Sequence, residues 1–109
     1  MCRLTVLYGH PTNPAEFDRY YHEVHIPIAR RMKGLTGWTI GKCQSLNRSD
    51  APPYYMIVGL YANTRAALEA IIASPEGQAT VADVPRFATG GATFVFDDET
   101  VLIPFALGN

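Results

Sequence analysis

Cysteine is scarce in this sequence, and no long hydrophobic run occurs. The two cysteines, Cys2 and Cys43, are too few for a disulfide framework, and their spacing matches no pair of metal ligands, so we expect two free thiols. No stretch approaches the roughly 20 apolar residues of a membrane span, and the short apolar N-terminal run lacks the cleavage site of a signal peptide. These absences predict a cytoplasmic protein with no membrane partner.

An excess of positive charge is also lacking. Nine basic residues against ten acidic ones give a formal charge of −1, which cannot supply the strong positive field of non-specific nucleic-acid binding. We therefore expect no nucleic-acid partner. Hydrophobic residues make up 48% of the chain and charged residues only 17%, which excludes intrinsic disorder and predicts one folded domain over residues 1–109.

The order of apolar runs and turn signals predicts an α+β fold. β-branched and aromatic runs predict strands, whereas apolar residues at steps of three and four predict helices. The expected strands span 2–9, 37–46, 54–62 and about 92–97; one helix follows residue 13, a second starts at 63–64, and a short helical segment opens at 74. This βαββαβ order is that of the ferredoxin-like fold, with a four-stranded antiparallel sheet whose second strand lies at an edge.

The start of the first helix has a clear signature. Asn13 is a good N-cap, Pro14 suits the first helical position, and Glu16 can reach back as in a capping box. An apolar stripe follows, typical of a helix that packs on a sheet, formed by Phe17, Tyr21, Val24, Ile28 and Met32.

In three of the expected strands, at 4–8, 54–61 and 93–96, apolar residues occupy both the odd- and the even-numbered positions. A sheet with helices on one face should otherwise alternate apolar and polar residues. Something must therefore cover its second face, and a second copy of the sheet is the simplest cover. We expect a homodimer; a different partner chain or a monomer with an exposed apolar face are the alternatives.

Two segments of the first helix carry a family resemblance. Residues 17–27 read FDRYYHEVHIP and residues 32–35 read MKGL, which resembles the first-helix motif of the EthD family. The second half is also similar, at 54–61, 66–70, 74–77, 83–87 and 90–93. The resemblance implies a dimeric α/β barrel built from two ferredoxin-like sheets. EthD proteins accompany catabolic or biosynthetic enzymes, and their superfamily includes cofactor-free cyclases, lactone isomerases, monooxygenases and haem-handling enzymes.

His25 is the strongest candidate for chemistry. A helical wheel places it at the border of the apolar stripe, beside Tyr21 and Met32, where it can face a cavity. Its imidazole titrates near neutrality and can act as base and then acid. Pro27 cannot donate to the Glu23 carbonyl, so we expect a bend next to His25. The resemblance adds that a histidine at this position acts in catalysis in isomerase and cyclase relatives. A structural histidine bonded to its neighbours remains the alternative.

Three neighbours on the same helix are further candidates. Tyr21, one turn before His25, can hold the imidazole or donate to a substrate oxygen, or can simply be core. Asp18 can orient His22 four residues on, or be a solvated surface acid. Asp18 and His22 are candidate binding residues.

Aromatic side chains are plentiful on the expected sheet. Most should be core or interface, but a few can line a pocket for a small hydrophobic or aromatic ligand. The candidates for this role are Trp38, Tyr8 and Phe94.

A metal site is not expected, because His22 and His25 have no convincing third ligand nearby. We expect no cofactor, although haem ligation by one histidine has precedent in the superfamily. Three functions therefore stay open. The first is a cofactor-independent acid/base enzyme, of cyclase, isomerase, dehydratase or oxygenase type, acting on a small aromatic or polyketide-like molecule. The second is a non-catalytic binding protein of a degradation pathway, and the third is a haem-binding protein.

Overall fold

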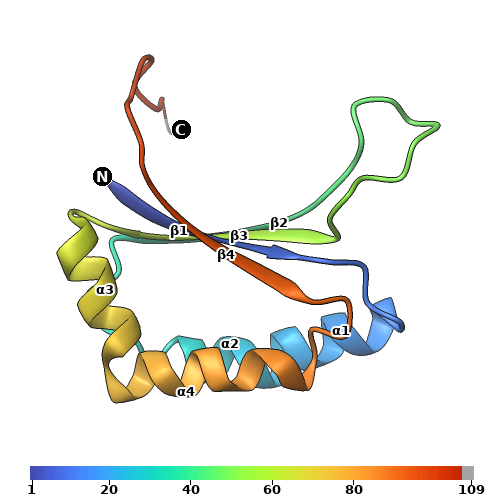
Figure 1. Cartoon of the computed structure of the whole chain (residues 1–109), viewed down its shortest axis with the longest axis horizontal. Coiled ribbons are helices and arrows are strands. Elements are labelled where there is room, and N and C mark those ends of the chain that lie inside the picture. The colour runs from blue at the N-terminus through green and yellow to red at the C-terminus, as the bar shows by residue number, and fades with distance from the viewer. Residues whose placement is uncertain (107–109) are drawn as a thin grey trace.

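The computed structural model describes residues 1–106, so the last three residues of the expected domain lie outside the described part. Its elements follow the βαββαβ order (Figure 1). They are β1 (Cys2–Tyr8), α1 (Pro14–Tyr20), the π-helical turn η1 (Tyr21–His25), α2 (Ile26–Ala29), β2 (Gly37–Lys42), β3 (Met56–Ala62), α3 (Arg65–Ala73), α4 (Pro75–Asp83), the 3-10 turn η2 (Val84–Arg86) and β4 (Ala92–Asp98).

The sheet has four antiparallel strands in the order β2-β3-β1-β4, which confirms the predicted ferredoxin-like fold with β2 at an edge. All the helices cover one face (Figure 1). The loop between β2 and β3 and the segment after β4 extend on the other side. Cys2 and Cys43 are free thiols, as the sequence predicts.

The two strands of the β2–β3 hairpin are shorter than predicted. β2 ends at Lys42 rather than residue 46, and β3 begins at Met56 rather than residue 54. The reason is the pairing with β1. The last residue of β1, Tyr8, pairs with Met56, so β3 has no β1 partner before Met56. Beyond that pair the chain enters the loop that contains Pro52 and Pro53, which cannot donate to a strand ladder.

The predicted N-cap of the first helix is confirmed. The Asn13 side chain accepts a hydrogen bond of 3.2 Å from the Glu16 backbone N–H, and Pro14 occupies the first turn. The expected capping box does not form, because the Glu16 carboxylate instead pairs with Arg19 at 2.6 Å. The later helices begin in the same way, at Thr64 and Ser74, whose hydroxyls accept from backbone N–H groups.

A π-helical turn directly precedes α2, next to Pro27, where the sequence predicts a bend. The Ile26 N–H bonds to the Tyr21 carbonyl, five residues back, and α2 continues directly from this turn. A wider turn accommodates a residue without an N–H and keeps side chains four residues apart on one face. The buried stripe therefore includes His25 and Ala29, while Val24 and Ile28 are only partly buried. His25 lies within the stripe, not at its border.

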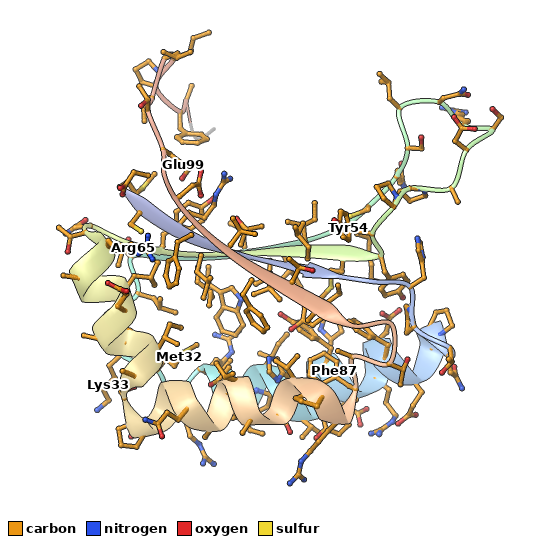
Figure 2. The ribbon with its side chains drawn as sticks, viewed as in Figure 1. Met32, Lys33, Tyr54, Arg65, Phe87 and Glu99 are labelled. Atoms are coloured by element: carbon orange, nitrogen blue, oxygen red, sulfur yellow. The ribbon has the colours of Figure 1, made fainter. Side chains whose placement is uncertain are left out.

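The core lies between the helices and the sheet. Alternate residues of β1, from Cys2 to Tyr8, are buried against the helices. Figure 2 shows Met32 and Phe87 pointing between the two layers, with Lys33 pointing outward. Within residues 1–106, no helix is long and apolar enough to cross a membrane.

The outer face of the sheet is mixed in character, so the expectation of an apolar second face is only partly met. The register places Phe94 opposite Val6, on the helix side, and Val95 opposite Thr5, on the outer side. Ile57 and Val95 are 41% and 45% exposed on this outer face. Next to them, Arg3 holds Asp97 through two hydrogen bonds of 3.0 and 2.9 Å.

The junction between α3 and α4 predicts one strong effect on stability. A Cβ on Gly77 would collide with the backbone oxygens of Ile71 and Ile72, which cannot move without breaking α3. We expect Gly77→Ala to lower the free energy of unfolding by about 1–3 kcal/mol or more, measured by urea denaturation. Gly41→Ala is the control, because nothing lies within 4 Å of its added Cβ, and its effect should stay within about 0.5 kcal/mol. Equal effects at the two positions would contradict this account.

Candidate functional site

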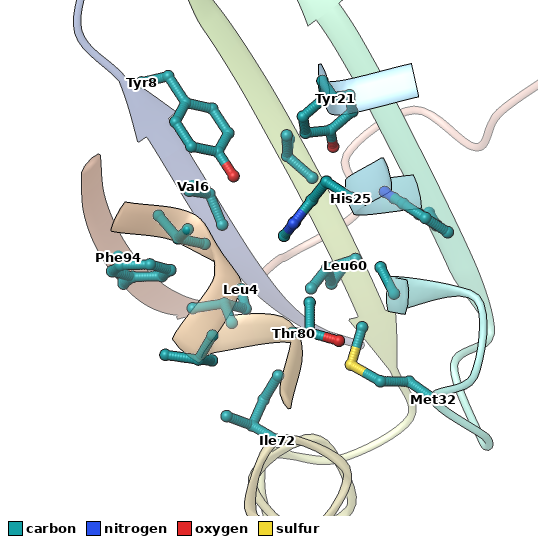
Figure 3. A pocket seen from close by; sticks show the side chains of 15 residues that line it. Leu4, Val6, Tyr8, Tyr21, His25, Met32, Leu60, Ile72, Thr80 and Phe94 are labelled. Atoms are coloured by element: carbon teal, nitrogen blue, oxygen red, sulfur yellow. The ribbon is translucent and has the colours of Figure 1, made fainter. Parts of the chain in front are cut away.

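A cavity of about 30 Å³ lies between the helical layer and the sheet. Five of the predicted site residues line it, namely His25, Tyr21, Tyr8, Trp38 and Phe94. Figure 3 shows the His25 ring among Tyr8, Tyr21, Thr80 and Met32, which come from both layers. A water molecule needs a cavity volume of roughly 10–15 Å³, so this cavity can hold about two waters.

His25 is held by a carboxylate from the other end of the helical layer. Its Nδ1 lies 2.9 Å from the Oδ2 of Asp83, and the two side chains are only 5% and 6% exposed. Two aromatic rings also pack against the imidazole, with centroid distances of 4.7 Å to Phe87 and 5.2 Å to Tyr21. The imidazole therefore has a fixed orientation.

Asp83 has three sources of stabilisation. The Tyr20 hydroxyl donates to its Oδ1 at 2.7 Å, and the exposed Arg86 guanidinium lies 4.0 Å from the same oxygen. The His25 ring contributes the third. Asp83 is the last residue of α4, where the helix dipole disfavours a negative charge, so these partners are needed to keep a buried carboxylate there.

The protonation of the site follows from this arrangement. Burial lowers the pKa of His25, and the opposing effect of Asp83 does not cancel it. The imidazole is therefore neutral at neutral pH. Because the Asp83 carboxylate only accepts, Nδ1 carries the proton, and Nε2 is left as an unprotonated base.

Two tyrosine hydroxyls and one indole complete the polar part of the cavity. Burial raises the pKa of Tyr21 to about 12 and also raises the pKa of Tyr8, so both hydroxyls remain protonated donors. The Nε1 of Trp38 is buried, and no hydrogen-bond partner for it exists among residues 1–106. The indole N–H faces the Tyr21 hydroxyl and lowers the pKa of that tyrosine against the larger effect of burial, although the two atoms lie beyond hydrogen-bond distance.

Asp18 and His22 do not belong to the cavity. Asp18 accepts hydrogen bonds from Lys42 Nζ at 2.9 Å and from the Tyr55 hydroxyl at 2.8 Å. These partners tie the first helix to the β2–β3 hairpin and lower the pKa of Asp18 against the cost of its burial. His22 is exposed. The expectation that Asp18 orients His22 is therefore replaced by a structural role for Asp18.

The described residues contain no group of three or more His, Cys, Asp or Glu side chains that could hold a metal ion. With Trp38 in place, the cavity beside His25 has about 30 Å³, which is smaller than a porphyrin.

Sequence reasoning missed Asp83, Tyr20 and Phe87 as parts of the site. Asp83 lies 58 residues from His25, so no local spacing connects the two. One signal was available: an acid at the last position of a helix, opposed by the dipole, needs partners of its own.

The fold and the site together define a ferredoxin-like domain with a neutral histidine in a small, mainly apolar cavity. The EthD domain model matches residues 9–91, and the chain belongs to the EthD family. An uncharacterized 11.0 kDa protein from the thcB–thcC intergenic region of Rhodococcus erythropolis is 39% identical over 104 residues, which cover 95% of this chain and all of that protein.

Solved structures share the fold. An EthD family protein from Bacillus halodurans has a TM-score of 0.84 at 24% identity, covering 92% of this chain and 99% of the other. A dimeric ferredoxin-like protein from Thermobifida fusca has a TM-score of 0.65 at 13% identity, covering 88% of each chain. SnoaB, a cofactor-independent oxygenase from Streptomyces nogalater, has a TM-score of 0.58 at 13% identity and covers 94% of this chain and 96% of its own.

The lowered pKa of His25 predicts a pH dependence of stability. Its pKa in the folded protein lies below the ordinary 6.5, so the unfolded chain binds the proton first as the pH falls. The free energy of unfolding should therefore decrease as the pH drops below about 6.5. His25→Asn keeps an N–H for Asp83 without titrating, so urea denaturation from pH 7.5 to 5 should give a flatter profile for this variant. His22→Asn, on the exposed side of the same turn, should keep the wild-type profile; a flattened profile there would contradict the assignment.

Proposed function

We propose that this protein is a cofactor-independent acid/base enzyme that moves a proton on a small aromatic or polyketide-like molecule. The observation that carries the proposal is the 2.9 Å contact between His25 Nδ1 and the Asp83 carboxylate, in which both side chains are buried. It makes Nε2 a base of fixed direction inside an apolar cavity, which is the arrangement that general base catalysis requires.

The chemistry assigns a role to each polar group. His25 Nε2 removes a proton from a carbon or oxygen of the ligand and later returns it. Tyr21, still protonated because its pKa is about 12, donates to the ligand oxygen that gains charge. Asp83 does not touch the ligand; it is a positioning residue that fixes the tautomer and stabilises the imidazolium as it forms. No step needs a cofactor, and the oxygenase SnoaB is an example of cofactor-independent chemistry on this fold.

The apolar lining of the cavity also supports a second candidate, a binding protein that holds a ring without changing it. Such a role would use the same cavity and would leave the Asp83–His25 pair as a structural link. Haem binding is not proposed, because no observation on the described residues favours it.

The same proposal includes a homodimer, in which a second copy covers the outer face of the sheet. It is supported by the exposed Ile57 and Val95 on that face and by the dimeric neighbour from Thermobifida fusca.

The enzyme proposal is tested with phenylacetone, an aryl ketone with slowly exchanging protons beside its carbonyl. The wild-type protein should accelerate deuterium uptake from D₂O at this position, followed by NMR. His25→Asn should lower the rate by about 10²-fold or more because the base is lost, whereas the exposed His22→Asn should have no effect. Saturable binding of phenylacetone without faster exchange would contradict the enzyme and favour the binding protein.

Asp83→Asn separates positioning from structure. The amide can donate to Nδ1, which would place the imidazole proton on Nε2 and remove the base. We expect a loss of exchange rate of about 10²-fold or more with KM nearly unchanged. A ¹⁵N NMR spectrum of the imidazole should change from the Nδ1–H to the Nε2–H tautomer; an unchanged tautomer and rate would exclude the positioning role.

The dimer is tested by sedimentation. The wild-type protein should have twice the 12.0 kDa mass of the chain at micromolar concentration. Val95→Glu should shift it towards the monomer because it buries a charge at the sheet–sheet contact. Ala82→Glu, an exposed position on α4, is the control and should remain dimeric. A wild-type monomer would contradict the proposal.

A further inference from the structure

The cavity at His25 is too small for the ligand class proposed above. Ligand pockets are typically about 300–1,000 Å³, whereas this cavity has about 30 Å³. A ring can therefore reach Nε2 only if one wall of the cavity moves. The inference below rests on the proposed function in one respect only, namely that the ligand site is the cavity at His25.

Trp38 lies between the cavity and the surface of the protein. Two hollows of about 280 and 400 Å³ lie on the surface beside it, next to Arg30. Of residues 1–106, Trp38 alone lines the cavity and both hollows. Displacing its ring would join three separate spaces into one site of the size that a ligand needs.

The Trp38 ring packs against the core through apolar contacts. Its Nε1 has no hydrogen-bond partner in the described part of the chain, although the atom is buried. It lies on β2, an edge strand that pairs on one side only, with β3. The contact that holds the ring from outside is with the Arg30 guanidinium, 5.7 Å from its centroid.

We propose that Trp38 controls access to His25: its ring swings outward to join the cavity to the hollows beside Arg30, and its indole N–H then binds the oxygen of the ligand. An indole N–H left without a partner in the closed state gains one when an oxygen acceptor arrives, which favours the open state. The cavity lining contains no Lys, Arg, Asp or Glu. The ligand is therefore a single-ring molecule with an uncharged carbonyl or phenolic oxygen.

Chemical modification measures this access without any catalysed reaction. Diethyl pyrocarbonate reacts with neutral imidazole, and the exposed His22 of the same chain is the internal reference in peptide mass spectrometry. In the wild-type protein His25 should react much more slowly than His22. Trp38→Ala should accelerate the reaction at His25 by about tenfold or more, since reactivity follows the open population, and leave His22 unchanged.

A milder variant protects the test against loss of folding. Arg30→Ala removes the outer contact of the ring from an exposed position, and should accelerate modification of His25 by roughly two- to fivefold. Matched controls are Ile40→Ala, which lines one hollow but not the cavity, and exposed Arg31→Ala. Neither should change the rate at His25.

The emission of Trp38 gives an independent measurement on the wild-type protein, because this is the only tryptophan of the chain. Phenylacetone should change the Trp38 fluorescence over the same concentrations at which it protects His25 from diethyl pyrocarbonate. Protection without a change in emission would overturn the proposal. So would an unchanged rate at His25 in both Trp38→Ala and Arg30→Ala, or acceleration only in Phe94→Ala, where the cavity also reaches an exposed side chain.

These outcomes are separate from those of the enzyme proposal. If Trp38 controls access but phenylacetone exchange does not depend on His25, only the enzymatic role fails. If exchange depends on His25 while the Trp38 and Arg30 variants behave as wild type, only the access role fails.

Discussion

The hydrogen bond from His25 to Asp83 joins the two halves of the helical layer, since His25 ends the π-helical turn after α1 and Asp83 ends α4. Both groups are buried, and neither would be stable there alone. A carboxylate without the imidazole would retain only the Tyr20 hydroxyl at hydrogen-bond distance, and the imidazole would lose its acceptor. The pair therefore determines the position of α4 against the first helix as well as the direction of Nε2.

Several local features are needed to make that bond. The π-helical turn accommodates Pro27 and keeps Tyr21 and His25 on one face of the helix. The tight junction at Gly77 brings α4 back along the first helix, so that Asp83 arrives beside the ring. Phe87 then closes the site from the segment after α4. Each feature is a structural requirement with a consequence for the proposed chemistry.

The energetic cost of the site is the burial of polar groups in an apolar cavity. Burial keeps His25 neutral and Tyr21 protonated, and these are the states that a base and a donor need at neutral pH. The same close packing leaves about 30 Å³ of space, so that a ligand requires a wall that can move. Trp38 fits this requirement because its indole N–H is unpaired and its strand lies at the sheet edge.

Local patterns in the sequence determined the elements and their order. The N-cap at Asn13, the apolar steps of three and four, and the β-branched runs are short-range signals, and they correctly predicted the ferredoxin-like sheet and the helix that carries His25. Tyr8, Trp38 and Phe94, the candidate pocket aromatics of the sheet, line the cavity, and Tyr21 reaches it from the π-helical turn. Their roles in function stay predictions.

Only the tertiary structure decided which groups meet. Asp83 lies 58 residues from His25, and Lys42 and Tyr55, which hold Asp18, lie on a different hairpin. A helical wheel assumes a regular α-helix, so it placed His25 at the border of the stripe; the π-helical turn moved it inside. The volume of the cavity also depends on how the helices pack on the sheet, and the spacing of residues along the chain does not predict this packing. The sequence thus determined what forms locally, while long-range contacts decided the partner, burial and protonation of His25.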